Sequence, residues 1–316
     1  MIQPPPLPPA ARRPRPQAAS FRYLRHKDLA RLRNLLFAAR SVVEGFYSGR
    51  HKSALKGHSP EFIEYRRYTP GDPISSIDWK AFARSDRYYI KVTEKETDMN
   101  CHLVLDSSAS MKYTGRNPVA VSKLNYASLL AASIAYLIVR QGDKVSLTRF
   151  NDKLTAHVPL GGTFSHLYRL VHSLEAGRPG GVTPVSRALR LAHPLFAKKG
   201  LLVVISDFYD DPVQLFRALG LYTHRRFEVL LLHLLHEEEA TLPDVPHACF
   251  VDAETGERIV CHTADMRRQY EANLAAFIGA LRSGARARKI DYMPIHTGMP
   301  YDGVLRRCLA ARRTGA

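Results

Sequence analysis

The sequence predicts an α/β protein with a mostly parallel sheet, covered by helices on both faces and preceded by a small, mostly β segment. Residues 103–105 and 201–205 are apolar without a break, and both runs end close to an aspartate, Asp106 and Asp207. Such runs are typical of strands that are buried on both faces of a sheet. Helical patterns alternate with strand patterns from residue 101 onward, which is the order of a parallel sheet with crossover helices.

The first hundred residues divide into three stretches. Residues 1–19 are rich in Pro and Arg and predict a disordered tail, whereas residues 21–44 have leucines at the spacing of an amphipathic helix. The following stretch, to residue 98, is rich in Gly, Ser and Tyr, with a turn signal in "YTPGDP" and a strand pattern at 87–94. We therefore expect a tail (1–19), an N-terminal helix with a β segment (20–100) and an α/β domain (101–316).

The α/β domain shows its elements in a regular alternation. The expected strands cover 101–106, 143–150, 200–207, 227–235 and 289–295. The expected helices cover 122–142, 166–174, 184–197, 211–225, 265–284 and 301–313. Residues 247–262 predict a hairpin that turns at Thr255 and Gly256.

Composition narrows the class of protein. The 316 residues carry a formal net charge of +17, which favours an acidic partner such as nucleic acid, anionic lipid or an acidic protein, or else a merely solvated basic surface. The sequence contains no basic motif interleaved with aromatic residues, of the kind that indicates RNA binding. No apolar run is long enough for a membrane span, no signal-peptide core is present, and the four cysteines form no CxxC pair. These features predict a reduced, cytoplasmic protein.

A cluster of hydroxyl side chains directly follows the first buried strand. The stretch "DSSASM" starts at Asp106 and includes Ser108 and Ser110, and a nucleophile, a helix cap or a cation site could each explain it. Ligands of open α/β sheets bind at the carboxyl ends of the strands. Asp207 ends another strand there, and Thr183 follows two glycines just before a helix. Together these five residues form our candidate site.

The residue types favour a hard divalent cation. Hydroxyl oxygens can ligate Mg²⁺ (or Mn²⁺ or Ca²⁺), and the two carboxylates balance its charge. Taken singly, Ser108 and Ser110 also fit a helix cap or a turn, Thr183 fits an N-cap before Pro184, and Asp207 fits a cap of the next helix. The combination at strand ends favours the metal.

The sequence supports an enzymatic function less well than a metal-binding one. A haloacid-dehalogenase-like phosphatase would need a second aspartate at Ser108, and no G-x-S-x-G, Walker A or G-x-G-x-x-G motif is present. "HEEEA" from His236 lacks the second histidine of H-E-x-x-H because position 240 is Ala240, and Cys261–His262 is an isolated pair. A metal-dependent hydrolase would need a general base, and the three candidate loops contain no histidine. We expect a non-enzymatic protein.

"DSSASM" and the later "ISD" resemble the von Willebrand factor A fold, a Rossmann-like sheet, with its metal-ion-dependent adhesion site. A more specific resemblance is to the bacterial "domain of unknown function 58" family, covering residues 40–310. It rests on a Y-x-x-G-D…I-D-W-x-x-x-A-R string upstream of the hydroxyl cluster. The string comprises Tyr68, Gly71, Asp72, Ile77, Asp78, Trp79, Ala83 and Arg84.

The resemblance implies a role for each candidate residue. In the resembled site Ser108, Ser110 and Thr183 would ligate the metal directly, and Asp106 and Asp207 would act through water and hydrogen bonds. The metal would bind an Asp or Glu carboxylate of a partner protein. The resemblance also implies a structural or partner-contact role for six residues of the upstream string: Tyr68, Gly71, Asp72, Asp78, Trp79 and Arg84. Of these, we expect Asp78 and Arg84 to tie the β segment to the domain, with Trp79 packed between the segment and the domain.

The family has no settled activity. Its members are often encoded beside MoxR-type AAA+ ATPases, which implies an adaptor or co-chaperone in protein maturation or complex assembly. The first expectation is therefore a metal-dependent protein-interaction module. A nucleic-acid or anionic-surface binding protein is the alternative, and a metal-dependent hydrolase is the third.

Overall fold

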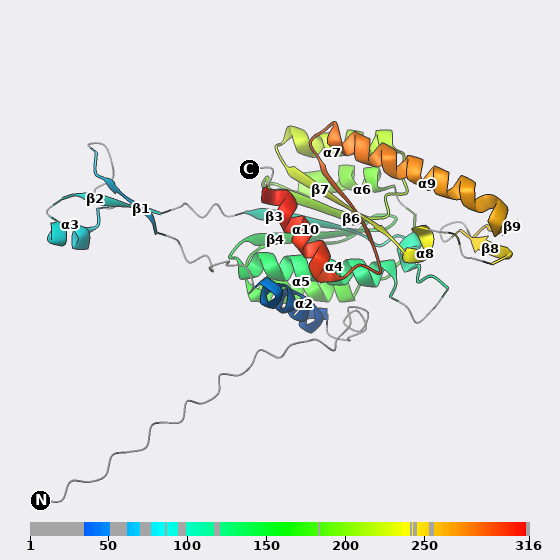
Figure 1. Cartoon of the computed structure of the whole chain (residues 1–316), viewed down its shortest axis with the longest axis horizontal. Coiled ribbons are helices and arrows are strands. Elements are labelled where there is room, and N and C mark those ends of the chain that lie inside the picture. Colours follow the sequence, from blue (N-terminus) through cyan, green and yellow to red (C-terminus); the bar gives the residue numbers. More distant parts are fainter. Residues whose placement is uncertain are drawn as a thin grey trace, which may run out of the picture.

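Figure 1 shows the computed structural model of the chain. The residues that the structure describes are 35–50, 62–69, 77–85, 87–93, 99–116, 121–182, 184–240, 242, 245–252 and 256–313.

A six-stranded sheet forms the centre of the α/β domain, in the spatial order β10–β7–β6–β3–β4–β5. Neighbouring strands pair parallel, except that β5 runs antiparallel to β4. The strands are β3 (Asn100–Asp106), β4 (Lys144–Phe150), β5 (Leu154–Gly161), β6 (Leu201–Ser206), β7 (Glu228–Leu235) and β10 (Asp291–His296). This sheet, with helices on both faces, confirms the predicted von Willebrand factor A-like fold class.

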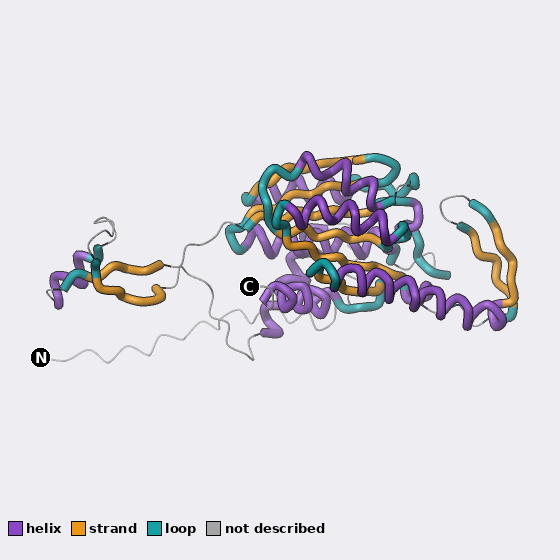
Figure 2. Tube along the Cα trace, turned by 90° about the horizontal axis from the view of Figure 1, so that it is seen from above, coloured by secondary structure: helices purple, strands orange, loops and turns teal. Residues whose placement is uncertain are grey.

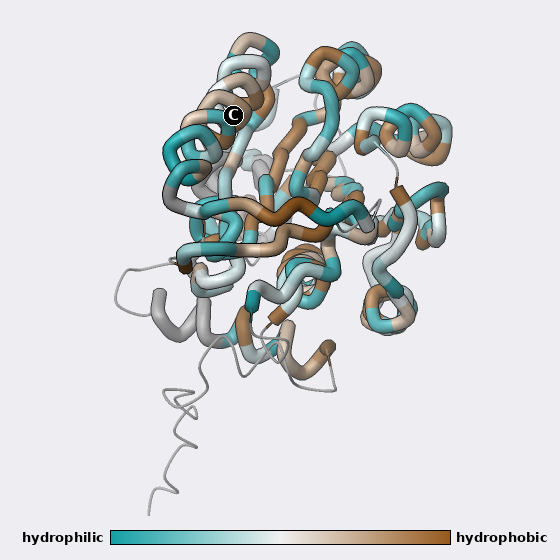
Figure 3. The backbone as a smooth tube through the Cα atoms, turned by 90° about the vertical axis from the view of Figure 1, so that its right-hand side faces the viewer, coloured by the Kyte–Doolittle hydropathy of each residue, from teal (hydrophilic) through white to brown (hydrophobic). Residues whose placement is uncertain are grey.

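Helices cover both faces of this sheet (Figures 1 and 2). One face carries α2 (Leu35–Arg50), α4 (Lys123–Arg140), α5 (Phe164–Glu175) and α10 (Tyr301–Arg313). The other carries α6 (Val185–Ala192), α7 (Pro212–His224) and α9 (Thr263–Arg286). Along several helices the hydropathy changes within each turn, because one stripe of such a helix faces the sheet (Figure 3), whereas α4 is buried along most of its length. No helix in the described ranges is both long and apolar enough to cross a bilayer.

The first described helix ends later than the sequence predicted. The leucine spacing predicted a helix over 21–44, whereas α2 spans Leu35–Arg50, and residues 21–34 lie outside the described residues. Small and β-branched residues of α2, namely Ala38, Ala39, Val42 and Val43, are buried in the domain core. The helix packs against α4, α5 and α10, so it belongs to the same core as the sheet.

The antiparallel edge strand β5 was not predicted. Its residues are mostly half-buried, since an edge strand has a partner on one side only, and its sequence contains Pro159. The apolar alternation that signals a strand is therefore weak in this segment. The short helical elements η2 (Ala109–Lys112) and α8 (Glu237–Ala240) were also missed, whereas η3 (His193–Leu195) continues the helix predicted over 184–197.

The predicted hairpin is confirmed. Strands β8 (His247–Val251) and β9 (Arg258–His262) pair antiparallel, with Gly256 at a left-handed φ of 75° in the connection. Thr255 lies outside the described residues. The hairpin and the first turns of α9 project from the domain (Figures 1 and 2).

The segment before the domain forms a small unit of two strands and one helix. Strand β1 (Phe62–Arg67) pairs antiparallel with β2 (Tyr89–Thr93), and α3 (Trp79–Ser85) lies between them in sequence. Phe82 stacks on Tyr88 at 4.5 Å between ring centroids. The unit stands apart from the α/β domain in Figures 1 and 2, so the expected packing beside that domain is not seen.

The residues of the upstream string serve this unit in part. Asp78 accepts a hydrogen bond from the backbone of Ala81, which caps α3, and the backbone of Tyr68 donates to Tyr88. Trp79 was expected to be packed between the segment and the domain, but it is 57% exposed, and Arg84 is exposed as well. Gly71 and Asp72 lie outside the described residues.

Candidate metal site at the carboxyl edge of the sheet

The two strands that end in aspartates are neighbours. β3 pairs parallel with β6, with Leu105 opposite Ile205, so Asp106 and Asp207 emerge at the same edge of the sheet. This confirms the predicted adjacency of the two apolar strands. Both aspartates are buried, and both therefore need polar or charged partners.

The serine loop brings two hydroxyls together next to Asp106. The backbone N–H of Ser108 donates to Asp106 Oδ1 at 2.8 Å, which folds the loop back over the end of the strand. Ser108 Oγ and Ser110 Oγ then lie 3.0 Å apart. Ser107 plays a different part, because its hydroxyl donates to the Phe150 carbonyl of β4 and anchors the loop to the sheet.

A second loop is fastened to the serine loop by backbone hydrogen bonds in both directions. Gly180 N–H donates to the Ser107 carbonyl and Ala109 N–H donates to the Gly181 carbonyl, both at 3.0 Å. Gly181 has a left-handed φ of 71°, and a Cβ there would meet the backbone of Asp152 at 2.8 Å, so glycine is required. Thr183 follows two residues later but lies outside the described residues, and its role as a ligand stays a prediction.

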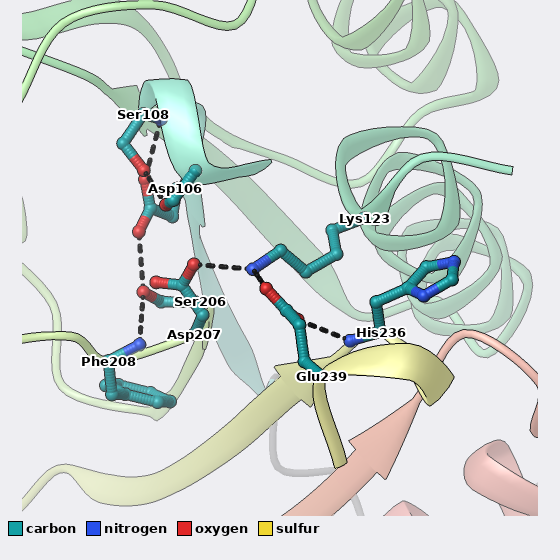
Figure 4. A network of polar contacts seen from close by, with 9 residues as sticks. Asp106, Ser108, Lys123, Ser206, Asp207, Phe208, His236 and Glu239 are labelled. Atoms are coloured by element: carbon teal, nitrogen blue, oxygen red, sulfur yellow. Dashed lines mark hydrogen bonds and ion pairs between the residues drawn. The ribbon is translucent and has the colours of Figure 1, made fainter. Parts of the chain in front are cut away.

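Strand β6 contributes a residue that the sequence analysis missed. Ser206 Oγ donates to Asp106 Oδ2 at 2.5 Å and accepts from the backbone N–H of Phe208 at 2.9 Å (Figure 4). Both oxygens of Asp106 are thus hydrogen-bonded, one to each neighbouring loop. Phe208 is wholly buried at a left-handed φ of 53°, so this turn is held in an uncommon conformation.

A buried lysine pairs with Asp207. Lys123 Nζ lies 2.9 Å from Asp207 Oδ2 and 2.8 Å from Glu239 Oε1, and the lysine side chain is 0% exposed (Figure 4). Its ammonium also stands over the Tyr209 ring, 5.6 Å from the centroid. The ion pairs join α4, the end of β6 and α8, which are distant in sequence.

The "HEEEA" stretch is a clamp rather than a metalloprotease motif. Each of its three glutamates faces a different basic side chain: Glu237 lies 3.7 Å from His296 Nδ1, Glu238 pairs with Arg116, and Glu239 pairs with Lys123. Glu239 also caps its own helix, because its Oε2 accepts from the backbone N–H of His236 at 2.6 Å. The clamp therefore ties α8 to the loop beyond the serines and to α4.

Burial controls the protonation of these groups. Burial, and then the nearby negative charge of Asp207, raise the pKa of Asp106 to about 7, although hydrogen bonds from Ser206 and Ser108 oppose the rise. Burial lowers the pKa of Lys123, but the attraction of Asp207 and Glu239 outweighs it, so the net pKa is raised and the ammonium stays charged.

The helix-cap interpretations do not hold for the described residues. Ser108 sits at the N-cap of η2, but its side chain makes no capping hydrogen bond. The helix after β6 is capped by Asp211, which accepts from Val213 N–H, and not by Asp207. Asp106, Ser108 and Asp207 are therefore held at the strand ends by contacts other than capping.

The hydroxyl pair fits a small divalent cation. An octahedral Mg²⁺ with bonds of about 2.0–2.1 Å places neighbouring ligand oxygens about 2.9 Å apart. Ser108 Oγ and Ser110 Oγ, hydrogen-bonded to each other, are separated by 3.0 Å, and the Asp106 carboxyl group holds their loop from behind. No cluster of three or more His, Cys, Asp or Glu side chains with metal-ligand geometry occurs in the described ranges, so the hydroxyls are the donors to test.

The mostly parallel sheet, with helices on both faces and polar loops at its carboxyl edge, defines an α/β domain. The chain belongs to the family described as "Protein of unknown function DUF58", whose model matches residues 64–277. That range includes the β1–α3–β2 unit, apart from the first two residues of β1, and the candidate site.

Similar proteins include an uncharacterized protein of Mycobacterium tuberculosis, Rv1480. It is 26% identical over 297 residues, which cover 92% of this chain and 91% of that protein. YeaD of Bacillus subtilis is 24% identical over 160 residues, 50% of this chain and 37% of that protein.

Among solved structures, BatB from Bacteroides thetaiotaomicron aligns with a TM-score of 0.46 at 17% identity, covering 68% of this chain and 99% of that one. The SpRpn10 VWA domain aligns with a TM-score of 0.42 at 11% identity, covering 66% of this chain and 94% of that one.

Proposed function

We propose that this chain is a non-enzymatic protein-interaction module that presents a divalent cation, Mg²⁺ (or Mn²⁺ or Ca²⁺), to a carboxylate of a partner protein. The observation that carries the proposal is the Ser108–Ser110 hydroxyl pair, 3.0 Å apart and held over the end of a buried strand by Asp106. Hydroxyl ligands are neutral, so a cation bound there keeps affinity for an external Asp or Glu.

The residues have separate tasks in this proposal. Ser108 and Ser110 hold the cation, together with Thr183 by resemblance. Asp106 fixes the serine loop through its Oδ1 and is itself fixed by Ser206. Asp207 adds negative charge but shares it with Lys123. When bound, the metal supplies a Lewis-acidic position for a carboxylate oxygen.

Exposed apolar side chains around the site favour a protein as the partner. Tyr113, Val182 and Tyr209 are all exposed, and each lies within three residues of a predicted ligand or site residue. Exposed tyrosines are enriched at protein contact sites relative to the rest of a protein surface. By the family resemblance, the partner we propose is a MoxR-type AAA+ ATPase or its client.

The test is an affinity pull-down from cell extract with and without Mg²⁺, with calorimetric titration of Mn²⁺ alongside. Ser110→Ala should weaken Mn²⁺ at least about tenfold while leaving the fold intact, because a loop hydroxyl contributes little to the core. Asp106→Ala should weaken it further. Ser165→Ala, an exposed serine on α5, is the matched control. Partner binding that survives both EDTA and Asp106→Ala would overturn the proposal.

A second candidate function, binding of a phosphate-bearing anionic surface, is favoured by the opposite edge of the sheet. Three neighbouring strands, β6, β7 and β10, are each preceded by two consecutive exposed basic residues. We name these the amino-edge basic pairs: Lys198–Lys199, Arg225–Arg226 and Arg288–Lys289. None of the six forms an ion pair with another described residue.

This second function predicts binding that depends on salt. Lys198→Gln/Lys199→Gln should weaken binding to vesicles of anionic lipid about thirtyfold, since each basic residue near such a surface contributes about 1 kcal/mol. Lys112→Gln/Lys153→Gln removes two exposed lysines elsewhere and serves as the control. Duplex DNA, titrated in parallel, separates a lipid surface from nucleic acid. Equal binding by both double variants would exclude the amino-edge basic pairs.

A further inference from the structure

Lys123 stands where an isolated cation would be strongly disfavoured. It is the first residue of α4, at the positive end of the helix dipole, and its side chain is completely buried. The first turn of α4 holds no acidic residue. The ammonium is therefore held by carboxylates from outside its helix, Asp207 at 2.9 Å and Glu239 at 2.8 Å.

The position of this ammonium changes the charge that a metal would meet. Asp207 was predicted to balance the charge of a divalent cation, yet its Oδ2 already accepts a hydrogen bond from the Lys123 ammonium. Two carboxylates, Asp207 and Glu239, share the single ammonium of Lys123, and the Asp207 charge in turn acts on Asp106 (Figure 4). A fixed positive charge beside a cation site opposes binding of the cation, and more strongly in a buried site than in water.

We propose that Lys123 is a resident counter-cation that sets the divalent-cation affinity of the site. Lys123 neutralises part of the charge of Asp207, so the isolated protein binds the metal weakly, and the carboxylate of a partner supplies the missing negative charge. This inference rests on the metal site of the proposed function. It adds a positioning residue and a reason for metal and partner to bind together.

Glu239 and Asp207 both contact the Lys123 ammonium, so substitutions of Glu239 can test the inference. Glu239→Gln removes one negative charge and leaves Lys123 to Asp207 alone, so the metal should bind more weakly. Lys123→Met/Glu239→Gln removes one charge of each sign and leaves Asp207 without its cation, so the metal should bind more tightly. The Glu239 side chain is partly exposed, which makes the Gln substitution tolerable for the fold.

The experiment is a titration of the purified full chain with Mn²⁺, followed by electron paramagnetic resonance of the free ion. Relative to the unmodified protein, Glu239→Gln should weaken Mn²⁺ several-fold. Lys123→Met/Glu239→Gln should bind at least about tenfold more tightly than Glu239→Gln alone. Ser110→Ala, added to each background, should abolish the tight site and so locate the ion.

The outcomes separate the two proposals. If Ser110→Ala leaves Mn²⁺ affinity unchanged in every background, the metal site of the proposed function is wrong. If Ser110→Ala abolishes binding but the two Glu239 variants bind alike, the metal site stands and the role of Lys123 is overturned. Should the double variant not fold, an unchanged Mn²⁺ affinity in Glu239→Gln alone overturns it as well.

Discussion

The two edges of the central sheet handle charge in opposite ways. At the carboxyl edge, Asp106, Asp207 and Lys123 are all buried, and each has a hydrogen-bond or ion-pair partner within 3 Å. At the amino edge, the basic pairs, Lys198–Lys199 among them, are exposed and form no ion pair within the described residues. Buried charges must be compensated, whereas exposed charges are screened by water. The charges of the carboxyl edge are therefore compensated within the fold, whereas those of the amino edge rely on solvent.

The largest expected effect comes from removing the buried ammonium. Lys123→Met leaves Asp207 and Glu239 without their shared cation, and breaking a buried ion pair typically costs about 3–5 kcal/mol. The free energy of unfolding, measured by urea denaturation at neutral pH without added metal, should fall by that amount.

Lys198→Met is the matched control at the amino edge. The residue is exposed and without an ion pair, so its substitution should change the unfolding free energy by no more than about 0.5 kcal/mol. Equal losses of unfolding free energy in Lys123→Met and Lys198→Met would contradict the distinction between compensated charges at the carboxyl edge and solvent-screened charges at the amino edge.

A pH effect of intermediate size is expected from His102, the buried titratable group near the amino edge. Its Nδ1 lies 2.8 Å from Ser146 Oγ and its Nε2 lies 2.9 Å from the Lys198 carbonyl. Burial lowers the pKa of His102 from 6.5 to about 4. The folded state then binds fewer protons than the unfolded state, so stability is present above pH 6.5 and is lost as the pH falls toward 4.

Between pH 7 and pH 5 this histidine alone should account for a loss of about 2 kcal/mol of unfolding free energy. His102→Gln, compared with the unmodified chain by urea denaturation at several pH values, should show a correspondingly smaller pH slope. Identical slopes would mean that the pKa of His102 does not differ between the folded and unfolded states. Other buried histidines contribute to both chains, so only the difference between the slopes is informative.

The same contrast explains how much of the fold could be predicted. Strands β3 and β6 were found because they are buried on both faces and therefore apolar throughout. The edge strand β5 was missed because its half-buried residues leave no clear alternation. Helix α3 was read as part of a β segment because only seven residues form it, fewer than a periodic pattern needs.

Within the candidate site, sequence reasoning found groups that are local to one loop. Asp106, Ser108 and Ser110 follow one strand, and Asp207 follows the strand paired with it. Lys123 was missed because its partners are 84 and 116 residues away. A signal was present nonetheless: a lysine that opens a helix, beside the Ser122 N-cap, opposes the helix dipole and so needs an external anion.

The smallest expected effect separates stability from binding at the amino edge. Arg226 and Lys289, the second members of two amino-edge basic pairs, have left-handed φ values of 59° and 55°. Glycine is the residue that such positions after a helix favour, because a Cβ is strained there.

Arg226→Gly should therefore raise the unfolding free energy by up to about 1 kcal/mol while weakening binding to anionic vesicles. Arg226→Ala removes the same charge but keeps the Cβ, so it should lose vesicle binding without gaining stability. If the glycine variant gains stability and binds vesicles as well as the unmodified chain, the charge of the strained Arg226 does not contribute to vesicle binding. That result would contradict the proposal that the amino-edge basic pairs bind an anionic surface.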